Sequence, residues 1–142
     1  MKWRKFVLEN GLHLSWVVAL VATLGSLYFS EVKEYLPCKL CWYQRILMYP
    51  QVLLLAIAAV RKQTGIYAYV LPMTLLGACV STYHYLMEKT DWIPSTSFSC
   101  GMVPCDIEYI NWLGFITIPF LALCGFVLIS IIHLLLWRYS RR

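Results

Sequence analysis

The sequence predicts an all-α integral membrane protein, a four-helix bundle. Of the 142 residues, 61% are hydrophobic and only 13% are charged, whereas a soluble domain carries about 25% charged residues. The apolar residues gather in four runs, each near the roughly 17 to 25 residues that cross a hydrocarbon core as a helix. The runs lack the period-two alternation of a membrane β-barrel. Because only helices and closed barrels satisfy their backbone inside a bilayer, helices remain as the spanning elements.

The four runs define one expected membrane domain over residues 1–142. We expect spans at about 12–29, 42–60, 66–87 and 112–137, with longer connecting loops at 30–41 and 88–111. The first run follows the basic stretch MKWRK, as a signal peptide would. However, the run ends in SLYFSEV, without a small-residue cleavage site, so we expect a retained helix.

The distribution of Lys and Arg predicts how the bundle is oriented. Eight basic residues fall on the side of the two termini: Lys2, Arg4, Lys5, Arg61, Lys62, Arg138, Arg141 and Arg142. The other side carries three lysines that are offset by acidic residues. Because positive charge is retained on the cytoplasmic side, both termini are expected there. The net charge of +5 is therefore a sign of membrane topology rather than of nucleic-acid binding.

Four cysteines are expected outside, where disulfides persist. Cys38 and Cys41 form a C-x-x-C pair before the second span, and Cys100 and Cys105 lie in loop 88–111. Their spacing is compatible with a four-cysteine zinc site, with two static disulfides that brace the loops, or with thiol–disulfide exchange. Cysteine spacing alone does not choose among these three.

The remaining cysteines and two of the histidines are interpreted structurally. Cys79 and Cys124 fall within spans, where a cysteine commonly packs as a small apolar residue. His13 and His133 lie towards the cytoplasmic ends of their spans, and we expect them at the membrane interface.

Arg45 is the residue that favours exchange chemistry. If the second helix begins near Pro37, Cys38 and Cys41 lie in its first turns, where the helix dipole favours a thiolate. Arg45 is four residues beyond Cys41 and projects from the same face, with Gln44 on its flank. Arg45 could simply extend to the interface, but a charge within a span is a functional hypothesis by default. A guanidinium beside a thiolate suits a carbonyl-bearing apolar ligand such as a quinone.

His84 is a second candidate for ligand contact. It lies in STYHYLMEK, about one turn inside the outer end of the third span. It could donate a hydrogen bond to a quinone oxygen or transfer a proton. The alternative is an interfacial histidine with a water partner.

The segments CKLCWYQR, ILMYP, CGMVPC and INWLGFITIPFLAL, carried on four spans, resemble the bacterial DsbB family of disulfide bond formation proteins. The likeness is greatest to its short BdbC-type members and covers nearly the whole chain. It implies a membrane thiol:quinone oxidoreductase that reoxidises an extracytoplasmic thioredoxin-fold thiol oxidase, with menaquinone or ubiquinone as electron acceptor. The rival functions are a tetraspan scaffold with structural disulfides and a membrane protein that binds a metal through four cysteines.

The resemblance also implies a role for each site residue. Cys100 would be attacked by the reduced partner, and Cys105 would then exchange with Cys38. Cys41 would face the quinone, which Arg45 would hold and polarise; His84, with Gln44 nearby, would contact it. Only four residues separate Cys100 from Cys105, fewer than in the longer members of the family, so a bridge between them would close a small loop.

Overall fold

The structure is a computed structural model that describes residues 2–34, 39–90 and 117–142. In these residues it consists of four long helices and one short 3₁₀ helix, without strands. The elements are α1 (Lys2–Glu31), α2 (Lys39–Arg61), η1 (Thr64–Ile66), α3 (Tyr67–Lys89) and α4 (Ile118–Ser140). Each long helix is long and apolar enough to cross a membrane. The all-α, four-span prediction is therefore confirmed.

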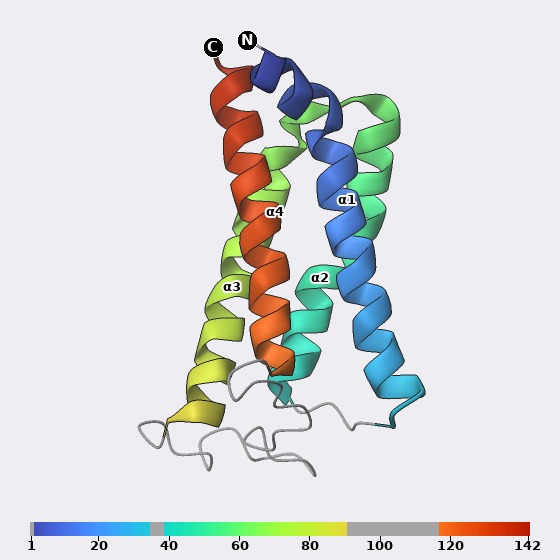
Figure 1. The fold of residues 1–142 in the computed structure, drawn as a ribbon, viewed down its shortest axis with the longest axis vertical. Coiled ribbons are helices and arrows are strands. Elements are labelled where there is room, and N and C mark those ends of the chain that lie inside the picture. The colour runs from blue at the N-terminus through green and yellow to red at the C-terminus, as the bar shows by residue number, and fades with distance from the viewer. Residues whose placement is uncertain (1, 35–38, 91–116) are drawn as a thin grey trace.

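The helix bounds differ from the apolar runs at several ends. The largest difference is in α1, which begins at Lys2 although its apolar run begins at about residue 12. The added turns run across the end of the bundle towards α4 (Figure 1). There the Arg4 Nη2 atom donates a hydrogen bond to the backbone oxygen of Tyr139 at 3.3 Å. The two termini consequently lie side by side at one end of the bundle.

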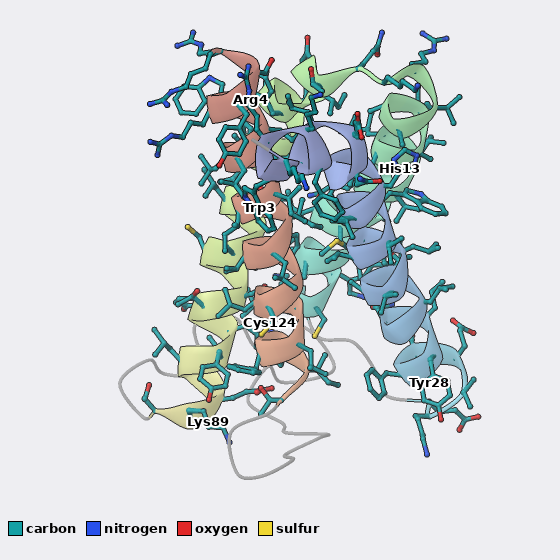
Figure 2. All side chains as sticks on the ribbon, turned by 45° about the horizontal axis from the view of Figure 1, so that its top comes forward. Trp3, Arg4, His13, Tyr28, Lys89 and Cys124 are labelled. Carbon is teal, nitrogen blue, oxygen red and sulfur yellow. The ribbon has the colours of Figure 1, made fainter. Side chains whose placement is uncertain are left out.

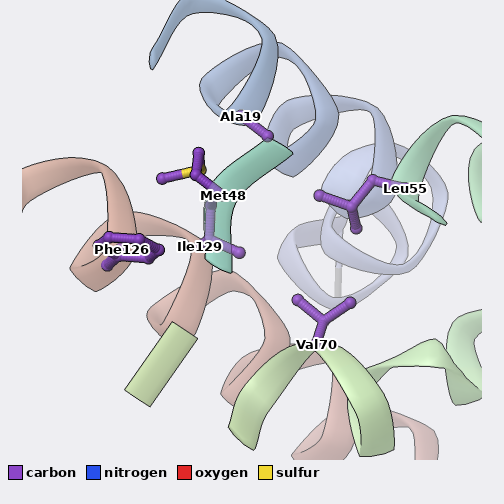
Figure 3. Packing of buried hydrophobic residues seen from close by; sticks show 6 residues of the cluster. All are labelled: Ala19, Met48, Leu55, Val70, Phe126 and Ile129. Atoms are coloured by element: carbon purple, nitrogen blue, oxygen red, sulfur yellow. The ribbon is translucent and has the colours of Figure 1, made fainter. Parts of the chain in front are cut away.

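The four helices form a bundle in which helices that pack on each other run antiparallel (Figure 1). α1 packs along α2 and α4, and α3 packs along the same two helices. A buried cluster in the middle joins all four helices (Figure 3): Ala19, Met48, Leu55, Val70, Phe126 and Ile129. The candidate site lies beside this core, towards the end of the bundle opposite the termini.

Some buried polar side chains form hydrogen bonds within their own helices. Ser15 donates to the Leu12 oxygen at 3.0 Å, Gln51 to the Leu47 oxygen at 2.9 Å, and Thr74 to the Leu71 oxygen at 2.9 Å. These bonds allow polar groups inside an apolar bundle, because an unpaired buried donor is costly.

Two structural interpretations of single residues were wrong. His133 is completely buried rather than interfacial, and its Nδ1 lies 2.9 Å from the Ile129 oxygen. Cys79 and Cys124 are exposed on the bundle surface rather than packed inside. The reason is the same in each case: the helices are apolar on most sides, so their sequence pattern does not tell which face is buried. His13 is exposed, near the end that carries the termini (Figure 2).

Candidate functional site

The site is a cavity of about 490 Å³ between α1, α2 and α4. Its walls are mainly aliphatic and aromatic, and a small number of polar or sulfur-bearing side chains also line it: Ser26, Ser30, Cys41, Gln44, Arg45, Met48, Tyr49 and Cys124. Its volume lies within the range of about 300–1,000 Å³ that is typical of small-molecule sites. An apolar cavity with a few polar groups is the usual form of such a site.

Cys41 lies at the end of this cavity where α2 begins. It is in the first turn of α2 and is partly buried, packed beside the buried pair Leu40 and Met87. The positive end of the α2 dipole falls at this turn and favours a thiolate there. The Cys41 sulfur therefore belongs to both the helix terminus and the cavity wall.

Arg45 lies one turn further along α2 and is partly buried. Its Nη2 atom donates to the backbone oxygen of Ser26 on α1 at 3.4 Å. Its guanidinium also stacks over the Trp42 ring, 5.4 Å from the ring centroid. Among the described residues, no carboxylate forms an ion pair with Arg45. The cation therefore points into the cavity, with neutral partners and with further donors available to a ligand.

Gln44 connects the cavity to the third helix. Its side chain is buried, and its Nε2 lies 3.3 Å from Nδ1 of His84. His84 is also buried, and its Nε2 lies 3.8 Å from a carboxylate oxygen of Glu88. His84 is not among the residues that line the cavity. It is placed behind Gln44, so the structure brings Gln44, Arg45 and Cys41 together and sets His84 one residue away.

The sequence reasoning missed several cavity residues, among them Ser26, Tyr49 and Cys124. Ser26 contributes from α1, Tyr49 from α2 and Cys124 from α4. The Tyr49 hydroxyl donates to the Ser26 Oγ at 3.2 Å. The sequence spacing could have predicted Tyr49, since it stands four residues after Arg45 on the same face of α2. No sequence spacing could have predicted Ser26 or Cys124, because they reach the cavity only through the packing of α1 and α4.

The other cysteines of the predicted relay are outside the part of the chain that the structure describes. These are Cys38, Cys100 and Cys105. Cys41 is the member of the proposed set whose surroundings are known.

The chain was compared with known proteins. The family model "Disulfide bond formation protein DsbB" matches residues 9–137. "Disulfide bond formation protein C" of Bacillus subtilis is 56% identical over 125 residues, covering 88% of this chain and 91% of the relative. "Probable disulfide formation protein C 1" of Bacillus anthracis is 54% identical over 87% of this chain and 88% of its own length. A "Probable disulfide formation protein" of Coxiella burnetii is 41% identical over 87% and 86%, respectively. No solved structure matches the chain.

Proposed function

Because this chain belongs to the DsbB family of disulfide bond formation proteins, we propose that it is a quinone-dependent membrane thiol oxidase. In this role it reoxidises an extracytoplasmic thioredoxin-fold thiol–disulfide oxidoreductase and so supports disulfide formation in secreted proteins. One observation carries the proposal: Cys41 and Arg45, one turn apart, line the same apolar cavity. A thiol and a carbonyl-binding cation thereby face one ligand site.

The residues present fit a quinone. The cavity is apolar enough to receive a lipid-soluble ring, and its walls come from helices that are long and apolar enough to span a membrane. Arg45 offers hydrogen bonds to a carbonyl oxygen. When bound, the quinone would supply the acceptor for the two electrons and two protons released as two thiols become a disulfide. Menaquinone and ubiquinone both have the ring carbonyls that this site would bind.

The side chains of the site would each have a separate task. Cys41 would present its sulfur to the cavity as a thiolate, favoured by the α2 terminus and by the cation one turn away. Arg45 would hold and polarise the ligand carbonyl. Gln44 would complete the polar wall, in an orientation fixed by His84 behind it.

The remaining cysteines would connect this site to the partner. A thiolate of the reduced partner would attack Cys100 and form a mixed disulfide, with Cys105 as the leaving thiol. Cys105 would then attack Cys38 in the Cys38–Cys41 disulfide and release Cys41 as a thiolate. Each exchange forms one S–S bond and breaks another, so electrons leave the partner and arrive at Cys41.

The charge distribution supports an orientation for this reaction. The end that carries both termini also carries exposed Lys and Arg side chains, as expected of a cytoplasmic side (Figure 2). Cys41 lies at the opposite end of α2 from the basic residue Arg61. The redox site would therefore face the extracytoplasmic compartment.

The test is anaerobic reduction of a quinone by the purified protein, with a reduced thioredoxin-fold protein as thiol donor. Turnover is followed by the quinone absorbance in the wild type, in Cys41→Ser and in Cys79→Ser. Cys79 is the matched control, because it is a cysteine in a spanning helix that does not line the cavity. We expect turnover to be lost only in Cys41→Ser. Absence of turnover in the wild type with several quinones and donors would favour the scaffold or the metal-binding function.

A further inference from the structure

We propose that Ser26 and Tyr49 form a second polar contact for the quinone headgroup, alongside Arg45; this inference rests on the proposed function. Two hydrogen bonds from successive turns of α2 meet at one residue of α1. Arg45 donates to the backbone oxygen of Ser26 at 3.4 Å, and the Tyr49 hydroxyl donates to its Oγ at 3.2 Å. All three side chains line the cavity.

The hydrogen bonding of Ser26 differs from that of three other hydroxyl residues in this bundle. Ser15, Thr74 and Thr82 each donate to a carbonyl of the preceding turn of their own helix, as helical Ser and Thr commonly do. Ser26 instead accepts a hydrogen bond from another helix. No acceptor among the described residues takes its own hydrogen. Because a hydroxyl both accepts and donates, Ser26 keeps one donor for a ligand in the cavity.

Tyr49 makes this donor more effective. In a chain of hydroxyls each bond polarises the next, so the bond from Tyr49 strengthens donation by Ser26. The surroundings are otherwise apolar, with Phe29, Val21 and Ala22 nearby in the same lining. In low dielectric, a correctly placed donor is worth more than it is in water. Arg45 and Ser26 would therefore donate to the carbonyl oxygens of the headgroup, and Tyr49 would act as a positioning residue through Ser26.

The experiment measures quinone binding without turnover. Cys124 lines the cavity and Cys79 does not, and both are exposed free thiols. A bound quinone should protect Cys124 from an apolar maleimide, with Cys79 in the same sample as internal reference. Alkylation of each peptide is read by mass spectrometry on the purified full-length chain. Short-chain ubiquinone and menaquinone analogues are used, because their fully substituted quinone rings do not readily add thiols.

We expect Tyr49→Phe to raise the half-protecting quinone concentration by about three- to tenfold, the effect of one lost hydrogen bond. Ser26→Ala should raise it by a similar factor. The half-protecting concentration of the double variant should not exceed that of the more affected single variant, because the two hydroxyls act as one unit. Tyr43→Phe, which alters an exposed tyrosine outside the cavity, should leave the concentration unchanged.

The outcomes separate this inference from the proposed function. A wild-type half-protecting concentration in Tyr49→Phe, with a raised one in Arg45→Ala, would overturn the role of Tyr49 and leave the thiol oxidase standing. Independent, additive effects of Ser26→Ala and Tyr49→Phe would also overturn it. If Tyr49→Phe lowers only the unfolding temperature, the hydrogen bond between Tyr49 and Ser26 stabilises the packing of α1 on α2 and has no role in quinone binding. If the wild type shows neither protection nor turnover, the proposed function itself fails.

Discussion

The Phe126 ring of α4 lies directly against Gly77 of α3, so closely that a Cβ on Gly77 would overlap the ring. Phe126 is completely buried in the central cluster, and it also lines the cavity. Small residues let membrane helices approach closely. Here one glycine sets the position of an aromatic wall of the candidate site.

Gly77→Ala should destabilise the bundle by about 1–3 kcal/mol, the usual cost of overpacking a core. It should also weaken quinone binding, because Phe126 lines the cavity and a displaced ring would change the cavity wall. Unfolding in detergent and the Cys124 protection assay measure the two effects. Gly65→Ala is the matched control, since a Cβ at Gly65 meets nothing within 4 Å and Gly65 does not line the cavity. Equal stability of the two variants would contradict the packing argument.

Arg45→His should weaken quinone use while leaving exchange with the partner intact. The guanidinium donates to Ser26 and stacks on Trp42, and a shorter side chain cannot reproduce this fork of donors. We expect a raised KM for quinone and normal reduction of the protein by the thiol partner in the absence of quinone. Equal turnover of the variant and the wild type at every quinone concentration would count against the role of Arg45.

Cys124→Phe should block the cavity. The added ring would occupy space that the short thiol leaves open in the lining, so quinone reduction should fall by more than tenfold. Cys79→Phe makes the same chemical change at an exposed position on α3 that does not line the cavity, and it should retain activity. Loss of activity in both variants would indicate a general effect of bulk on folding.

His84→Leu should act through Gln44. The buried Gln44 amide would lose its partner on α3, and a buried donor left unpaired costs about 1–3 kcal/mol. Quinone affinity should fall in His84→Leu and should fall little further in the double variant with Gln44→Leu. Additive losses in this double-mutant cycle would show that His84 acts independently of Gln44.

Cys105→Ser should trap a mixed disulfide between Cys100 and the partner, because the thiol that resolves it is absent. The linked peptides are identified by mass spectrometry after non-reducing isolation. A partner trapped at Cys38 instead would reverse the proposed order of exchange.

Local spacing determined a large part of this protein. The four apolar runs predicted the four spanning helices, since the thickness of a bilayer fixes their length. The separation of Cys41 and Arg45 by four residues predicted that both face one side of α2, and both line the cavity. The segments that resemble the DsbB family predicted the membership that the comparisons confirm.

Tertiary packing decided which residues of the other helices lie opposite the face of α2 that carries Cys41 and Arg45. Ser26 and Cys124 reach the cavity because α1 packs along both α2 and α4 there, and His84 is separated from the cavity by Gln44. Helical spacing relates residues of one helix, but it does not fix the rotation of a neighbouring helix. In helices that are apolar on most sides, that rotation is set by close packing, such as that of Phe126 on Gly77, and by hydrogen bonds between helices, such as that of Tyr49 to Ser26.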